Sequence, residues 1–153
     1  MMYAQGDEFI KDFVMRTKSN LFFLEKSQYE VTQLINSMIG FLIIPEQKQY
    51  NHIVDGMIDD VLFQKISNCI DKNTYSTAVN LQQICRHLRN AVAHSNISFQ
   101  AEKPNISSQP LIIHSAKFVD ENKRTNEYIE ITLTIELLKE FLIAFSEAVS
   151  NLP

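Results

Sequence analysis

The stretch Leu81–His94 reads LQQICRHLRNAVAH and decides how this 153-residue chain is interpreted. On a helix at about 100° per residue, its apolar side chains gather on one side. These residues are Leu81, Ile84, Cys85, Leu88 and Val92, with Ala91 at the edge. The opposite arc carries Arg86, His87, Arg89, Asn90 and His94, with Ala93 in its middle. The pattern predicts a helix with one side in the core and a polar arc opposite.

Apolar residues also recur at three-to-four spacing before this stretch and near the C-terminus, which predicts further helices. The predicted helices are Asp7–Ser27, Tyr29–Ile44, Ile58–Ile70, Ser76–His94 and Ile135–Val149. Pro45 ends the second, because the residue before a proline is pushed out of helical conformation. The polar residues 71–74 open the fourth helix. Thr134 is the expected N-cap of the last.

Between the fourth and last helices the chain is rich in β-branched and aromatic residues, which predicts short strands. The segments are Ile97–Phe99, Leu111–Val119 and Tyr128–Leu133. The polar residues 120–126 predict a hairpin loop between the last two. We therefore expect a mainly α fold, a bundle of about five helices with a small β-hairpin before the last helix. It forms a single domain over residues 1–153.

Charge and composition exclude several classes of protein. The net charge is −4, whereas proteins that coat nucleic acid non-specifically are usually basic. A nucleic-acid enzyme whose positive charge is gathered locally stays possible. Two cysteines are too few for a disulfide scaffold or thiolate metal site. We expect a cytoplasmic protein with no membrane partner, because the chain shows no secretory signal and no apolar run near the roughly 20 residues of a membrane span.

The polar arc has the residue types that RNA cleavage needs. Histidine, with an unperturbed pKa of about 6.5, can move protons near neutral pH, and the arginine fork can bind a phosphorus centre that gathers charge. No metal or other cofactor is required when the 2′-hydroxyl is the nucleophile. His52 and His114 stand at no metal-ligand spacing. The alternative is a solvated face, with His94 interacting favourably with the helix dipole.

Spacing within the arc limits what one helix can do. Asn90 lies one turn from both Arg86 and His94, so these side chains can touch. Arg89 and His94 are separated by more than roughly 100° around the helix. One helix would therefore not bring them together on a single phosphate, whereas a second copy or a bound substrate could.

The residues Arg89–His94, RNAVAH, resemble the motif of the HEPN superfamily (higher eukaryote and prokaryote nucleotide-binding). In that motif an Arg and a polar residue are followed by a His after four to six intervening positions. The segments 13–21 (FVMRTKSNL) and 29–37 (YEVTQLINS) are similar to the opening helices of small, single-domain bacterial members, often plasmid-borne. The closing hairpin and helix are similar too, so the resemblance covers most of the chain.

The resemblance implies a metal-independent endoribonuclease that acts as a homodimer with a composite site. It is of the toxin, phage-defence or stress-response type, with a possible antitoxin as partner. Carried over, His94 is the general acid or base, Arg89 the phosphate donor, and Asn90 orients them or the RNA. Two alternatives stay open. One is a non-catalytic module that binds a nucleotide, RNA or a partner protein, and the other is a purely structural adaptor.

Four further residues are expected to support the site: Arg86, His87, Glu30 and Asn36. The first two follow from the polar arc. The others belong, with Gln33 and Ser37, to a polar stripe in an apolar helix. Buried polar groups need partners, so either this stripe faces the active helix or neighbouring backbone satisfies it.

One position departs from the family pattern. HEPN toxins that are silenced by a nucleotidyltransferase carry a Tyr two residues after the His. Here that position is Asn96. We therefore expect no control by adenylylation there.

Overall fold

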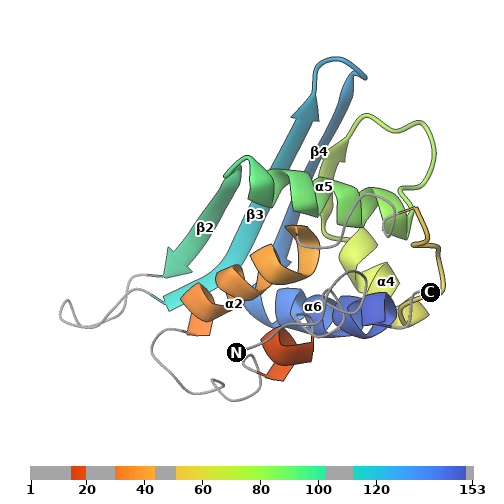
Figure 1. Ribbon diagram of the computed structural model, residues 1–153. Coiled ribbons are helices and arrows are strands. Elements are labelled where there is room, and N and C mark those ends of the chain that lie inside the picture. The colour runs from red at the N-terminus through yellow and green to blue at the C-terminus, as the bar shows by residue number, and fades with distance from the viewer. Residues whose placement is uncertain (1–14, 20–29, 44–50, 103–111, 151–153) are drawn as a thin grey trace.

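The computed structural model describes residues 15–19, 30–43, 51–102 and 112–150 (Figure 1). Residues 15–19 are helical. The elements that follow are α2 (Glu30–Met38), the π-helix η1 (Ile39–Ile43), α4 (Asp60–Ser67), β1 (Ile70–Asn73), α5 (Leu81–Ala93), β2 (Ile97–Glu102), β3 (Ile112–Asn122), β4 (Glu127–Thr134) and α6 (Ile135–Ser150). Most of the first predicted helix, Asp7–Ser27, lies outside the described residues.

The four strands form one antiparallel sheet in the order β1-β4-β3-β2. The predicted mainly α bundle with a small hairpin is therefore wrong, and the fold is α+β. All three β-rich segments form strands of this sheet: β3 pairs with both β2 and β4, and it runs to Asn122, into the predicted loop. The fourth strand, β1, is the polar segment that was expected to open a helix.

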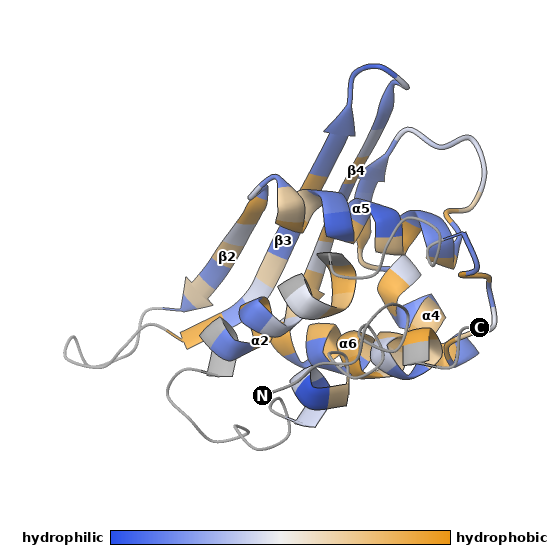
Figure 2. Cartoon of the chain, viewed as in Figure 1, coloured by the Kyte–Doolittle hydropathy of each residue, from blue (hydrophilic) through white to orange (hydrophobic). Residues whose placement is uncertain are grey.

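Residues on one face of the sheet form one side of the hydrophobic core. Side chains alternate along a strand, so the pairs Ala116–Leu133, Phe118–Ile131 and Asp120–Ile129 share that face. Helix α5 packs against β3 and η1, and α6 packs against β3 and β4. Figure 1 shows these helices on one side of the sheet. The far end of the β3–β4 hairpin is hydrophilic (Figure 2). Two layers, helices on sheet, therefore build the domain.

The last helix agrees with the sequence. Helix α6 covers Ile135–Ser150 against the predicted Ile135–Val149, and Thr134 Oγ1 accepts the amide N–H of Leu137 at 3.1 Å. The predicted apolar side of α5 is also buried. This confirms both the N-cap and the direction in which the two helices face.

Two helices start later than predicted, because side chains cap them. Helix α5 begins at Leu81 instead of Ser76, since Asn80 and Gln83 form a capping box. Helix α4 begins at Asp60, capped by Asp59, and it ends before Ile70 enters β1. No helix within the described ranges is long and apolar enough to cross a membrane.

A carboxylate sits at the centre of the sheet face that points away from the helices. Glu130 is buried and accepts hydrogen bonds from Lys117 and Tyr128, with Lys72 Nζ at 3.4 Å. The hydrogen bonds from Lys117 and then Tyr128 lower the pKa of Glu130 to about 2. Because Lys72 is in β1, this group ties the edge strand to the centre of the sheet.

We expect the Glu130→Gln variant to lose part of the acid sensitivity of folding. The folded-state pKa is lowered from the ordinary 4.5 to about 2, so the ionised group stabilises the fold fully above the ordinary value. That contribution is lost as the pH falls from about 4.5 towards 2. Urea denaturation across this range measures it, and Glu102→Gln, an exposed carboxylate on β2, is the control. Equal slopes for wild type and Glu130→Gln would contradict the assignment.

Candidate functional site

Helix α5 presents its polar arc to the β3–β4 hairpin and to the turn that follows the helix. The side chains of the arc differ in exposure. His87 is only 2% exposed, because β3 packs along that side of α5. Arg86, Arg89 and Asn90 are half-buried, whereas His94 is exposed. The two histidines of α5 therefore have different environments.

Both ring nitrogens of His87 are in contact with partners. Nδ1 lies 2.6 Å from Asp120 Oδ2, and Nε2 lies 2.7 Å from the hydroxyl of Tyr75. The same Oδ2 accepts a hydrogen bond from Asn90 Nδ2 at 3.1 Å. His87 is thus part of a closed internal network and has no nitrogen left for a substrate. A role of His87 in supporting the site stays a prediction, and these contacts leave only an indirect one.

Arg86 also binds within the protein. Its Nη2 donates to the Tyr75 hydroxyl at 2.9 Å and to Glu127 Oε1 at 3.0 Å. Thr125 donates to the other carboxylate oxygen of Glu127 at 2.8 Å. The Thr125 hydrogen bond, and after it Arg86, holds the pKa of Glu127 below its usual value, and burial raises that of Tyr75. Arg86 therefore links α5 to the β3–β4 hairpin through Glu127.

Sequence reasoning missed Tyr75, Asp120 and Glu127. A signal for Asp120 was present, because it continues the buried row Ala116, Phe118 at a spacing of two. The sequence pattern predicts a strand that ends at Val119, which places Asp120 in a loop. Tyr75 and Glu127 carry no local signal, since they meet α5 only through the sheet.

The three motif residues lie at the C-terminal end of α5. Arg89 and Asn90 are near the end of the helix, and His94 is its C-cap, with its amide N–H bonded to Asn90 O at 2.9 Å. Five residues of helix separate Arg89 from His94 by about 140° around the axis and about 7.5 Å along it. One protomer therefore presents these two side chains in different directions, as the spacing predicted.

A left-handed turn fixes the backbone after His94. Ser95 has φ 58°, its N–H bonds to Val92 O at 3.1 Å, and the Asn96 N–H bonds to Ala91 O at 2.8 Å. These are the two hydrogen bonds of a Schellman motif, which closes a helix end. Asn96 O in turn accepts the N–H of Val119 at 3.1 Å. The position of His94 is thus set from the helix and from the sheet.

We expect Ser95→Gly to stabilise the fold by about 1 kcal/mol. A residue with a Cβ carries a steric cost in the left-handed region that glycine does not have. Thermal unfolding measures the change. Ser98→Gly is the matched control, because Ser98 lies in β2, where glycine is expected to destabilise by roughly 0.5–1 kcal/mol. A lower melting temperature for Ser95→Gly would contradict this interpretation.

An open hollow of about 410 Å³ begins directly after His94. It is lined by Ser95, Asn96, Ile97, Ser98, Val119 and Glu121. Hydroxyl, amide and carboxylate groups line it together with two aliphatic side chains. The exposed histidine of the motif therefore lies next to a hollow with hydrogen-bonding groups.

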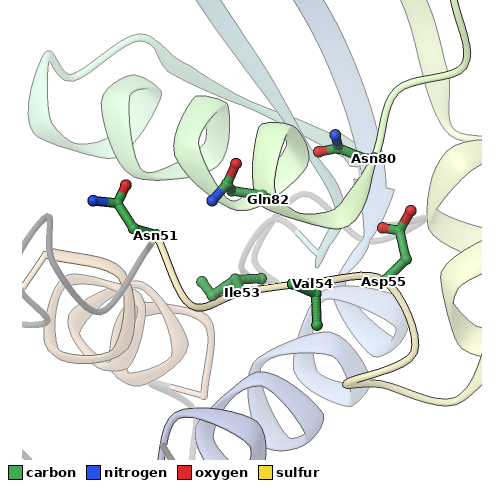
Figure 3. Close-up of a pocket in the computed structure, with 6 residues that line it drawn as sticks. All are labelled: Asn51, Ile53, Val54, Asp55, Asn80 and Gln82. Atoms are coloured by element: carbon green, nitrogen blue, oxygen red, sulfur yellow. The ribbon is translucent and has the colours of Figure 1, made fainter.

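A second hollow of about 410 Å³ lies at the other end of α5 (Figure 3). It is lined by Asn51, Ile53, Val54, Asp55, Asn80 and Gln82. Asp55 Oδ1 accepts the N–H of Leu81 at 2.8 Å, so a carboxylate already occupies the helix N-terminus. None of the predicted site residues lines this hollow. Because Arg89, Asn90 and His94 lie at the opposite end of α5, next to the first hollow, the candidate site is at the C-terminal end of the helix.

The polar residues of α2 give a mixed result. Asn36 is exposed, and Ser37 is buried with its hydroxyl unpaired among the described residues. Glu30 begins α2, and its side chain lies outside what the structure describes. Helix α2 packs against η1 and α6. A role of this stripe in the site stays a prediction.

Neither cysteine gives the site a reactive thiol. Cys69 and Cys85 are both free, and burial raises the pKa of each thiol. In the part of the chain that the structure describes, no group of three or more His, Cys, Asp or Glu residues is arranged to hold a metal ion. The functional groups of the candidate site are therefore the side chains of Arg89, Asn90 and His94.

One protein-family model, HEPN pEK499 p136, matches residues 1–152. No curated protein and no solved structure matches the chain significantly. The family match covers nearly the whole chain and includes the Arg89–His94 motif at the end of α5. The chain therefore belongs to the HEPN pEK499 p136 family, which places its function among those related to nucleotides and RNA.

Proposed function

We propose that the protein is a metal-independent endoribonuclease that cuts RNA through attack of the 2′-hydroxyl. One observation carries the proposal: of the two histidines on α5, His87 is enclosed by Tyr75 and Asp120, whereas His94 is exposed at the helix end. An exposed imidazole, together with an arginine and an amide on the same end of the helix, is a set of groups suited to acid–base catalysis on a phosphodiester.

His94 and Arg89 each have a chemical task in this reaction. An imidazole takes the proton from the 2′-hydroxyl, and O2′ attacks phosphorus. The bond from phosphorus to O5′ breaks, and O5′ takes up a proton from a second imidazole. The guanidinium of Arg89 stabilises the negative charge on the phosphoryl oxygens. The products are a 2′,3′-cyclic phosphate and a 5′-hydroxyl.

The proposed site needs two protomers. A base and an acid are both required, and one protomer offers one exposed motif histidine, His94. In a symmetric dimer, the partner's His94 supplies the second imidazole, and the separation of Arg89 from His94 is bridged across the interface. Ala93, exposed beside His94, leaves room for a second α5 to approach.

The proposed biological setting is a toxin, phage-defence or stress-response system in the cytoplasm. A ribonuclease of this kind would be toxic when unrestrained, so an antitoxin protein is the expected partner. Expression in a bacterial host tests this setting. We expect growth arrest with wild type and normal growth with His94→Ala.

The direct test is cleavage of single-stranded RNA by purified protein in excess EDTA. We expect cleavage, with 2′,3′-cyclic phosphate ends in the products and no cleavage of the same strand carrying 2′-O-methyl groups. Loss of activity in EDTA, or equal cleavage of 2′-O-methyl RNA, would overturn the proposal. RNA binding without turnover would instead identify a non-catalytic binding module.

A further inference from the structure

Asp120 lies on the inner face of the sheet and is only 4% exposed. It ends the row that begins with Ala116 and Phe118, so the surrounding face is apolar. A buried carboxylate is costly unless hydrogen bonds compensate for the lost water. Asp120 Oδ2 has two such contacts, with His87 Nδ1 at 2.6 Å and Asn90 Nδ2 at 3.1 Å. The second partner belongs to the HEPN motif.

The hydrogen bond that Asn90 Nδ2 donates to the Asp120 carboxylate sets the orientation of the Asn90 amide. The NH₂ group of Asn90 must point to Asp120, so its carbonyl oxygen, Oδ1, lies on the other branch of the amide. The position of Asp120 is fixed in turn through His87, whose far nitrogen is 2.7 Å from the Tyr75 hydroxyl. The chain Tyr75–His87–Asp120–Asn90 thus joins the segment after β1, helix α5 and β3.

We propose that Asp120 is a positioning residue that turns Asn90 so that Oδ1 is offered to the substrate as a hydrogen-bond acceptor. The ligand group that fits an acceptor at this site is a 2′-hydroxyl of RNA. The reacting 2′-hydroxyl gives its single proton to the imidazole, so Oδ1 accepts from the 2′-hydroxyl of a neighbouring nucleotide. Such an acceptor would distinguish RNA from DNA, which has no donor there. The inference rests on the proposed function for the identity of the substrate, but not for the orientation of Asn90.

The Asp120→Asn variant keeps the size of the side chain and removes the constraint. An amide at position 120 can both accept and donate, so Asn90 is free to reverse. We expect kcat for RNA cleavage to fall by about 10- to 100-fold, as small misplacements of reacting groups do, with a smaller change in KM. In an Asn90→Ala background the same change should cost nothing further, because the group it positions is absent.

The matched control is Asp71→Asn. Asp71 Oδ2 bonds Thr132 Oγ1 at 2.5 Å on the outer face of the same sheet, so the same chemical change is made on the other side of the sheet. We expect activity like that of wild type. A loss for Asp120→Asn that is equally large with and without Asn90 would overturn the positioning role, since Asp120 would then act through another group.

A readout without catalysis separates this inference from the proposed function. The side-chain NH₂ of Asn90, assigned by ¹⁵N NMR in the free protein, should exchange slowly with water in wild type and faster in Asp120→Asn. Rapid exchange in wild type would overturn the inference even if RNA is cut. Slow exchange in a protein that cuts no RNA would support the orientation of Asn90 and would contradict only the ribonuclease proposal.

Discussion

His94→Ala is expected to lower the rate of RNA cleavage by about 10²–10⁴-fold, the range that a positioned general acid or base contributes. The fold should be unaffected, because the His94 side chain is exposed and its structural contacts as C-cap are made by the backbone. Single-turnover cleavage and a denaturation curve on the same samples measure both quantities. His114→Ala, an exposed histidine on β3, is the control. Equal trace activity in wild type and His94→Ala would show that the site is elsewhere.

Mixing wild-type and His94→Ala subunits tests the composite site. When each site uses both protomers, activity follows the square of the wild-type fraction, so an equal mixture of randomly exchanged subunits keeps about one quarter of the activity. When each protomer acts alone, one half remains. Co-expression with two affinity tags isolates the mixed dimers. An active mixed dimer would show that one His94 suffices and would exclude the two-imidazole mechanism.

Local periodicity predicted the helices that build the core. The apolar spacing in α5 and α6 identified their buried sides correctly, because each helix turns these side chains into the shared hydrophobic core. The fold class was wrong because strand β1, with the sequence IDKN, has no apolar alternation. Its place in the sheet comes from pairing with β4, about sixty residues later, at Ile70–Ile131 and Lys72–Glu130. Such a partner is invisible to any local window.

The candidate site, like the fold, was predicted correctly where the signal is local and missed where it depends on tertiary contacts. The motif Arg89–His94 was found from spacing, and its separation around the helix was anticipated. The helical projection could not separate His87 from His94, since both fall on the polar arc. The difference comes from the element that packs on the arc. Strand β3 brings Asp120 against His87, whereas His94, the C-cap of α5, is exposed. Tertiary packing thus decides which histidine is buried.

His87→Leu is expected to destabilise the protein by about 3 kcal/mol or more, the cost of leaving the buried Asp120 carboxylate without its shortest hydrogen-bond contact. Asp120 would keep the hydrogen bond from Asn90 but lose the contact at 2.6 Å in a site where it is 4% exposed. Tyr75 would keep Arg86 and Glu127 as partners. The free energy of unfolding from urea titration measures the loss. His52→Leu, on an exposed loop, should change it by less than about 0.5 kcal/mol.

The double variant His87→Leu/Asp120→Leu decides the cause of that loss. Removing both partners of a buried pair removes the uncompensated charge, and apolar replacements of such pairs are often neutral or stabilising. We therefore expect the double variant to be more stable than His87→Leu alone, although it carries one more substitution in the core. A further loss would show that shape, and not charge, makes His87 important. The double variant should still have lowered RNA cleavage, because Asn90 no longer has the acceptor that orients it.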